Sequence, residues 1–424
     1  MKTEINYAHI VDPSIGLNKI CSLYIENQYV SAVETAPDGW TADKIIDAKD
    51  HYLIPGIVDI ATRLREPGQE HKATIASETY AAASAGITSL VVQPDTSPVI
   101  NTPAEVELIQ QKSNTAGHCH VYVIGALTQD LGGNLLSEMA ALKEAGVVGV
   151  SNCLHPLASN LVLRRAMEYA SSQELTLFMH PVDHDLAGNG CIHEGMTATR
   201  MGLSGIPSAA ETAAVGSCLA LIEQTDVQVH FCRISTQRTL QLLERAKFDG
   251  APISADICAH QLFYSDQDIQ SFDGNFHVIP PFRSQVDVIG LRQRLSSEII
   301  LSLCSDHQPH DPDAKLAPFP STEPGISSLE TLLPLTLRLV EDEVITLPMA
   351  IALLTYKPAQ LLNIDAGSLA PGKPADICIF NPHTEWTLSS NNMNSQGKNT
   401  PFINQQFKGQ VTHTLVNGKT VYQK

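Results

Sequence analysis

The sequence predicts an α/β fold built on an eight-stranded parallel (β/α)8 barrel, with a small β domain formed jointly by the two ends of the chain. The middle of the chain alternates short apolar runs with helix-forming stretches, whereas both ends contain short strand-like runs separated by turns. Repeated strand and helix units imply a parallel sheet, and so many units in about 300 residues favour a closed barrel. The 424 residues are enough for one large and one small domain.

The first strand-like runs end near Leu53, and from there apolar runs alternate with helix-forming stretches, as expected of the barrel. Seven later apolar runs are typical of barrel strands: ITSLVVQP (87–94), HVYVIGAL (120–127), VVGVSNC (147–153), LTLFMHP (175–181), VQVHFCRIS (227–235), PISADICAH (252–260) and IILSLCSDH (299–307). Between two of them we expect a helix over 102–112, because Thr102 can cap it and Glu105 lies three residues later.

After Ile364 the sequence returns to strands and turn dipeptides such as Asn417-Gly418. We therefore divide the chain into residues 1–53 and 365–424, which share the small β domain, and residues 54–364, which form the barrel. The polar stretch 389–401 is rich in Asn and Ser, so we expect a loop there, and a mobile one.

Composition excludes several classes of partner. The net charge of −18 disfavours nucleic acid and anionic lipid, since both select basic surfaces. No apolar run reaches the roughly 18 residues of a membrane span, and the polar start lacks the apolar core of a signal peptide. We expect a cytoplasmic protein with no membrane partner. Its nine cysteines stand singly, as expected of buried thiols and not of disulfides or zinc knuckles.

The stretch PGIVDIATRLREPGQEH (55–71) resembles the entrance to a metal-dependent active site, because catalytic groups in such barrels follow the strands. Side chains alternate along a strand, so Ala61 and Arg63 share one side of it, where a metal would need donors. Later strand ends offer His180, then His230 and Arg233, and finally Asp306, the best candidate for a functional carboxylate.

Several ordered motifs make the chain resemble the dihydroorotases of the cyclic amidohydrolase superfamily over nearly its whole length. They are LREPGQEHKATI, AAASAGITSLVVQPDTSPVI, GLSGIPSAAE, PPFRS, SDHQPH, ETLLPL, PAQLLNIDAGSLAPGKPADICIF and NTPF. The resemblance implies an amidohydrolase-type barrel and a metal site made of an HxH pair, a bridging carboxylate, two more histidines and an aspartate.

Most of those metal ligands are replaced. By resemblance, the HxH pair falls on Ala61 and Arg63, and the SDDG-like stretch that supplies the bridge reads Ser151-Asn152-Cys153-Leu154. The next histidine is retained as His180, the following one is Arg233, and the aspartate is retained as Asp306. Only two of the six donors remain, whereas zinc sites need at least three protein ligands.

The two arginines are worse than neutral replacements, because a guanidinium stays protonated and offers no lone pair. A unit charge about 4 Å from a dication, at an effective dielectric constant of about 20, is repelled by roughly 8 kcal/mol. We expect no zinc and no catalysis. Arg63 and Arg233 could instead neutralise Asp306 in place of metals, or both could point to solvent.

Other donors could in principle rebuild a metal site on the loops, although we regard most of them as structural. They are His184, His193, His307, His310, Asp183 and Cys153.

Some of the residues that the resemblance assigns to substrate binding are also replaced. Arg65 and His310 remain, but the asparagine of a PNT-like stretch is Asp95, and a carboxylate there would repel the carboxylate of dihydroorotate. The PNPP of relatives reads VIPP, with Ile279. Arg65 could also serve only as a structural partner of Glu66.

The resemblance thus implies an inactive dihydroorotase homologue that acts as the non-catalytic partner of the aspartate carbamoyltransferase catalytic subunit, with six chains of each in a dodecamer. Two alternatives stay open. The chain could be an active cyclic amidohydrolase with an atypical metal site, or it could be a regulatory subunit that senses a ligand in the old pocket.

Overall fold

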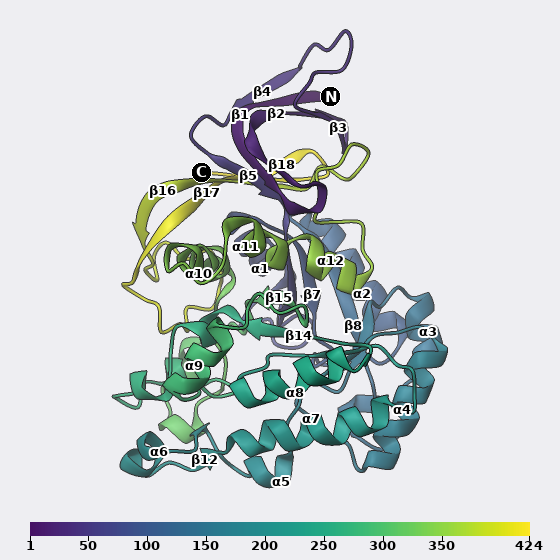
Figure 1. The fold of residues 1–424 in the computed structure, drawn as a ribbon, viewed down its shortest axis with the longest axis vertical. Coiled ribbons are helices and arrows are strands. Elements are labelled where there is room, and N and C mark those ends of the chain that lie inside the picture. Colours follow the sequence, from purple (N-terminus) through teal and green to yellow (C-terminus); the bar gives the residue numbers. More distant parts are fainter.

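The computed structural model describes residues 1–424 and contains the predicted barrel together with a β domain built from both chain ends (Figure 1). The strands of the barrel are β6 (Ile57–Thr62), β7 (Ile87–Val92), β8 (His120–Ala126), β9 (Gly149–Ser151), β10 (Leu177–Met179), β13 (Val229–Phe231), β14 (Ile253–Cys258) and β15 (Ile300–Cys304). Each pairs in parallel with the next, so all eight predicted strands are confirmed.

The barrel closes between its first and last strands. Thr62 and His307 form a parallel bridge. The Arg63 N–H donates to the His307 carbonyl over 2.9 Å, and the His307 N–H donates to the Ala61 carbonyl over 3.1 Å. The residues that follow β6 and β15 are therefore held side by side at the carboxyl end of the barrel.

Helices connect and cover the strands. They are α1 (Ile75–Ser84), α2 (Pro103–Ala116), α3 (Met139–Glu144), α4 (Asn160–Ser172), α5 (His184–Ala187), α6 (Met196–Met201), α7 (Ser208–Ile222), α8 (Gln237–Phe248), α9 (Gln285–Arg292), α10 (Leu329–Glu341), α11 (Leu347–Leu354) and α12 (Tyr356–Leu362). The helix expected from residue 102 is α2, with the capping box between Thr102 and Glu105 present. A short pair, β11 (Ile192–His193) and β12 (Gly205–Ile206), lies between α5 and α7.

The small domain is a single sheet of eight strands, and both chain ends belong to it (Figure 1). Its strands are β1 (Lys2–Asp12), β2 (Leu17–Glu26), β3 (Tyr29–Val33), β4 (Lys44–Asp47), β5 (Tyr52–Pro55), β16 (Ile377–Thr387), β17 (Gln406–Val416) and β18 (Lys419–Gln423). The N-terminal and C-terminal halves join where β16 pairs antiparallel with β5. The boundary that we placed at residue 53 lies inside β5.

The small domain packs firmly on the barrel. Val11, Cys378 and Phe380 of the small domain belong to the same buried apolar cluster as the barrel strands. All nine cysteines are free thiols; eight of them are buried and Cys21 is half-buried. No helix is both long and apolar enough to cross a lipid bilayer.

Candidate functional site

Arg63 is buried at the carboxyl end of the barrel and points inward. Its Nε donates to Asp95 Oδ2 over 2.7 Å, and its Nη1 lies 3.6 Å from Asp306 Oδ1. Burial disfavours the charged guanidinium, but the carboxylates of Asp95 and Asp306 outweigh it and raise the pKa of Arg63. The alternative in which this side chain points to solvent is therefore wrong.

Arg233 is even more deeply buried, with 2 % of its surface exposed. It lies two residues after the end of β13 with φ of 56°, and its Nη1 donates to Asp306 Oδ1. The same guanidinium donates from Nε to His180 Nδ1 over 3.1 Å. Burial opposes its charge, but Asp306 lies so close that the pKa of Arg233 is raised. Both arginines thus meet at Asp306, as the neutralisation hypothesis expects.

The two retained metal-ligand positions already accept hydrogen bonds from protein groups. His180 receives hydrogen bonds from Arg233, and burial together with the two guanidinium groups holds the pKa of His180 well below its ordinary value. The second carboxylate oxygen of Asp306 accepts from Gln308 Nε2 over 3.0 Å. Gln308 was not singled out from the sequence, although it stands inside the SDHQPH motif.

The two remaining ligand positions, Ala61 and the stretch that would supply the bridge, offer no free oxygen or imidazole. Ala61 is a buried methyl group packed among apolar side chains. Cys153 replaces the bridging carboxylate, and burial raises the pKa of its thiol. Asn152 beside it is fully used, since its Oδ1 accepts from Thr128 Oγ1 over 2.6 Å and its Nδ2 donates to the His155 carbonyl over 3.0 Å.

Donor side chains also cluster in two buried groups deeper in the barrel, one of His230, Cys232 and Asp256 and one of Cys258, His260 and Asp306. In the first group both ring nitrogens of His230 are bonded, to Ser254 Oγ over 2.7 Å and to Asp256 Oδ2 over 2.9 Å.

In the second group, the Arg233 guanidinium already pairs with the Asp306 carboxylate that an ion would need. A dication there would be repelled by the buried guanidinium that bonds this carboxylate. The residues present therefore do not fit a zinc ion at either group or at the positions that the resemblance assigns to metals.

The loop donors that could have rebuilt a site are not brought together. His307 bonds Glu78 through Nε2 over 2.8 Å and accepts from the Ser328 N–H at Nδ1 over 3.1 Å. His193 lies 3.4 Å from an arginine nitrogen of Arg283, and His184 is exposed on α5. His310 is 3.4 Å from the Glu323 carboxylate, away from Asp306.

Arg65 contacts the loop that follows β15. Its Nε donates to the Pro309 carbonyl over 2.9 Å, and its Nη2 lies 3.0 Å from His310 Nε2. Burial lowers the pKa of Arg65 to about 10, and burial together with Arg65 lowers that of His310 to about 2. Glu66 pairs with Lys112 over 2.5 Å, so the suggested Arg65–Glu66 pair is wrong.

Two cavities adjoin this cluster, and the larger one, of about 380 Å³, is lined by Asn152, Cys153 and His180, among others. A cavity of about 30 Å³ is lined by His180, Arg233 and Ile279, among others. Such a volume accommodates a water molecule or two. The apolar side chain of Ile279, which stands where relatives have asparagine, helps to close it.

The stretch 389–401 is a loop, as expected, but it is tied to the barrel. Asn399 Oδ1 accepts from the His310 N–H over 2.8 Å, and its Nδ2 donates to the Gln308 carbonyl over 2.9 Å. Ser395 Oγ donates to Glu78 over 2.6 Å. We expected mobility from composition alone, which does not reveal these hydrogen bonds. The NTPF motif, which contains Asn399, was the feature of the sequence that could have indicated them.

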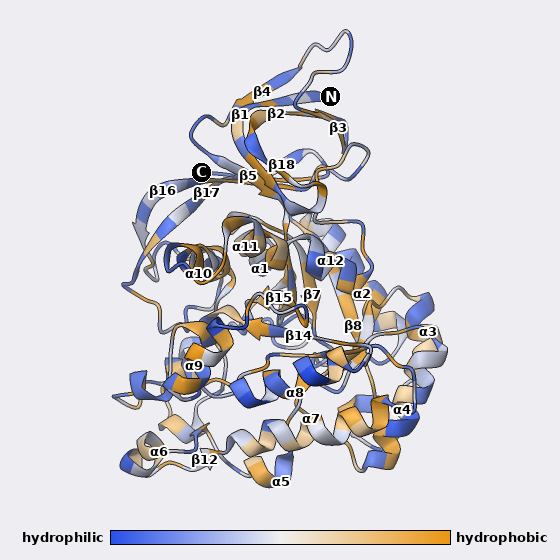
Figure 2. Ribbon diagram, viewed as in Figure 1, coloured by the Kyte–Doolittle hydropathy of each residue, from blue (hydrophilic) through white to orange (hydrophobic).

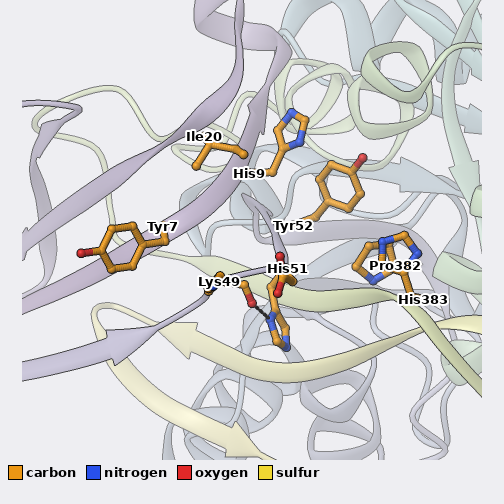
Figure 3. A pocket seen from close by; sticks show the side chains of 9 residues that line it. Tyr7, His9, Ile20, Lys49, His51, Tyr52, Pro382 and His383 are labelled. Carbon is orange, nitrogen blue, oxygen red and sulfur yellow. Dashed lines mark hydrogen bonds between the residues drawn. The ribbon is translucent and has the colours of Figure 1, made fainter.

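A larger hollow, of about 520 Å³, lies on the small domain and contains none of these residues (Figure 3). His9 packs against Tyr52 with ring centroids 4.8 Å apart, and the His51 Nδ1 donates to the Lys49 carbonyl over 2.7 Å. It is an open, surface-exposed hollow that is separate from the barrel centre.

Comparisons with known proteins place these features in a family. Residues 50–239 match the model described as dihydro-orotase-like, and residues 326–422 match an amidohydrolase family model. The chain is 42% identical to a dihydroorotase-like protein of Pseudomonas aeruginosa, with 100% of both chains covered. It is 36% identical to a dihydroorotase of Geobacter metallireducens, also with 100% of both covered.

Solved structures support the fold alone. The L-hydantoinase (dihydropyrimidinase) of Arthrobacter aurescens superposes with a TM-score of 0.89 at 20% identity, covering 100% of this chain and 96% of that one.

Proposed function

Since the chain belongs to the dihydroorotase-like family of amidohydrolases, we propose that it is a non-catalytic member that assembles with the aspartate carbamoyltransferase catalytic subunit in pyrimidine biosynthesis. In this proposal six copies of each chain form a cytoplasmic dodecamer, without a catalytic zinc ion in this subunit. The chain keeps the motifs that build the barrel and has lost those that hold metal, so its scaffold is what remains for function.

One observation supports the loss of catalysis most strongly. Two buried guanidinium groups meet the carboxylate of Asp306, and one of them also fills the lone pair of His180. With Asp95, these groups number two cations and two anions, so their formal charges cancel without a metal. A zinc-bound water is how this chemistry proceeds at neutral pH, and no residue here replaces that nucleophile.

His180 lines two cavities, one of about 30 Å³ beside Arg233 and one of about 380 Å³ that also contains Asn152 and Cys153. Ligand sites for small molecules usually occupy about 300–1,000 Å³. The cavity of about 30 Å³ next to Arg233 would not take up a six-membered ring. The larger cavity lies within that range, so the proposed loss of catalysis rests on the arginines and not on a lack of space.

Co-expression with the organism's aspartate carbamoyltransferase tests the assembly proposal. The expected result is a single complex whose mass corresponds to six chains of each kind and whose carbamoyltransferase activity exceeds that of the transferase alone. Two separate species with unchanged activity would contradict it.

An active dihydroorotase is the second candidate, because relatives of 36–37% identity over their whole length carry that name. It predicts stoichiometric bound metal and turnover of dihydroorotate that a chelator abolishes. The assembly proposal predicts neither.

A further inference from the structure

The hollow on the small domain has the volume of a small-molecule site. It measures about 520 Å³, within the range of about 300–1,000 Å³ that is usual for such sites. Figure 3 shows Tyr7 and Ile20 toward its left side and Pro382 and His383 toward its right. None of its lining residues belongs to the barrel centre, so the loss of metal ligands there leaves this hollow unaffected.

The hollow lies where β16 leaves the buried core. The residues of β16 are buried from Ile377 to Phe380, and beyond Phe380 none of them is buried. In Figure 2 the projecting part of β16 is accordingly drawn mostly in blue and white. Pro382 and His383 line the hollow just after this change, so it faces water on one side and the packed sheet on the other.

A row of side chains crosses four strands along the hollow. His9 of β1 pairs with Ile20 of β2 and with Tyr52 of β5, and Tyr52 pairs with Phe380 of β16. Residues that pair directly across strands point to the same face of a sheet. The ring centroids of His9 and Tyr52 lie 4.8 Å apart, and those of Tyr52 and Phe380 lie 5.5 Å apart. The row therefore forms a continuous and mostly aromatic surface.

Neighbouring residues hold this aromatic surface in place. Phe380 is buried and supports the Tyr52 ring. Asn18 Oδ1 accepts from His9 Nε2 over 2.7 Å, which fixes the imidazole ring. His9 and Tyr52 are half-buried and line the hollow, so part of each ring is open to a ligand. Flat heteroaromatic rings such as nucleobases stack on aromatic side chains of this kind.

The polar side chains around the hollow suit the other two parts of a nucleotide. Lys49 is exposed, lines the hollow and forms no ion pair, so its ammonium group is available to a phosphate. His51 and His383 add ring nitrogens, and Asp50 is the one carboxylate among the lining residues. A carboxylate near a bound base can accept hydrogen bonds from ribose hydroxyl groups. The hollow thus offers a partner for the base, the sugar and the phosphate.

We propose that this hollow of the small domain binds a nucleoside phosphate. The base stacks on Tyr52 and His9, the ribose hydroxyl groups donate to Asp50, and the phosphate lies against Lys49. His9 and Tyr52 come from the N-terminal part of the chain and His383 from β16, so the ligand bridges the two halves of the domain. This inference does not depend on the proposed assembly function.

Isothermal titration of the full chain with UMP and with AMP tests the proposal. The wild-type chain should bind at least one of them with a Kd below about 1 mM. Its melting temperature should rise with the nucleotide concentration, because a ligand of the folded state stabilises that state. Uridine, adenosine and inorganic phosphate each carry only part of the ligand and should bind at least about tenfold more weakly.

Three variants test whether the nucleotide occupies the hollow. Lys49→Glu replaces the cation by a carboxylate and should weaken binding at least about tenfold, most strongly at low salt. Tyr52→Ala removes the stacking ring and should weaken binding by a similar factor, whereas Tyr52→Phe keeps the ring and should bind within about twofold of the wild type. Lys49 is exposed, so Lys49→Glu should keep the melting temperature of the wild type without ligand.

Lys419→Glu is the matched control, because Lys419 is an exposed lysine of the same domain that does not line the hollow. It should bind the nucleotide as the wild type does. The inference fails if neither nucleotide binds the wild-type chain, or if a nucleoside or phosphate alone binds as tightly as the nucleotide. It also fails if Lys49→Glu and Tyr52→Ala both leave binding unchanged, since the nucleotide would then lie elsewhere. The co-expression experiment tests the assembly proposal separately.

Discussion

Arg233 and Asp306 form a buried ion pair that joins the ends of β13 and β15. Both side chains are almost fully buried, at 1% and 4% exposure. The pair stands at two positions where the family resemblance implies metal ligands, and the guanidinium brings a positive charge to the Asp306 carboxylate there.

Replacement of Arg233 by alanine should destabilise the fold. It leaves the Asp306 carboxylate and the His180 ring buried without their main donor, and breaking a buried pair from one side costs about 3–5 kcal/mol. Denaturant unfolding of the variant and the wild type measures the difference. A double variant, Arg233→Met with Asp306→Leu, removes both charges and should recover much of the loss. An unchanged unfolding midpoint for Arg233→Ala would contradict the pairing.

Arg63 and Asp95 should be energetically coupled. Their 2.7 Å contact is buried on the arginine side, and Asp95 keeps a lowered pKa because the arginines outweigh the effect of burial. A double-mutant cycle with Arg63→Met and Asp95→Asn should give a coupling of at least about 1 kcal/mol. Additive effects of the two substitutions would mean that the contact contributes nothing.

Stability should fall as the pH drops below about 6.5. Burial lowers the pKa of His260 to about 4 and that of His310 to about 2. Between the ordinary histidine pKa and these values the unfolded chain binds protons that the folded chain refuses, so each histidine costs about 1.4 kcal/mol per pH unit. Unfolding measured from pH 7 to pH 4.5 should show this slope, and His310→Asn should reduce it. A slope unaffected by that variant would refute the assignment.

Asn399 should control the order of the loop that carries His310. Replacement by alanine removes its bonds to the His310 N–H and to the carbonyls of Gln308 and Gly325. Leaving these backbone groups unpaired should cost about 1–3 kcal/mol. Hydrogen exchange at the His310 amide should accelerate in the variant, while amides of β8 exchange as in the wild type. Equal protection of the His310 amide in the variant and the wild type would show that the loop stays ordered without the Asn399 side chain.

The barrel could be predicted because its strands are continuous apolar runs buried on both faces, and because some helices begin with local capping chemistry, such as that of Thr102 and Glu105. The pairs that charged side chains form across the fold could not be predicted from the sequence. Glu66 bonds Lys112, which lies 46 residues further along the chain, and no local pattern announces that contact.

The prediction that a metal site is missing rests on Ala61, Arg63 and Arg233, since side-chain chemistry alone excludes these residues as donors. The orientation of the arginines depended on the barrel closure that sets Arg63 beside Asp306, and it required the structure. The same is true of Asn399, whose role arises from contacts 89 and 91 residues away.

The most direct test of the central claim is to measure bound metal and dihydroorotate turnover on one purified sample, before and after incubation with excess zinc. The account predicts less than one zinc ion in ten chains and no turnover in either state, because Arg63 and Arg233 exclude the ion. Stoichiometric zinc with turnover that a chelator removes would contradict it, and would show that the arginines move aside to admit a metal.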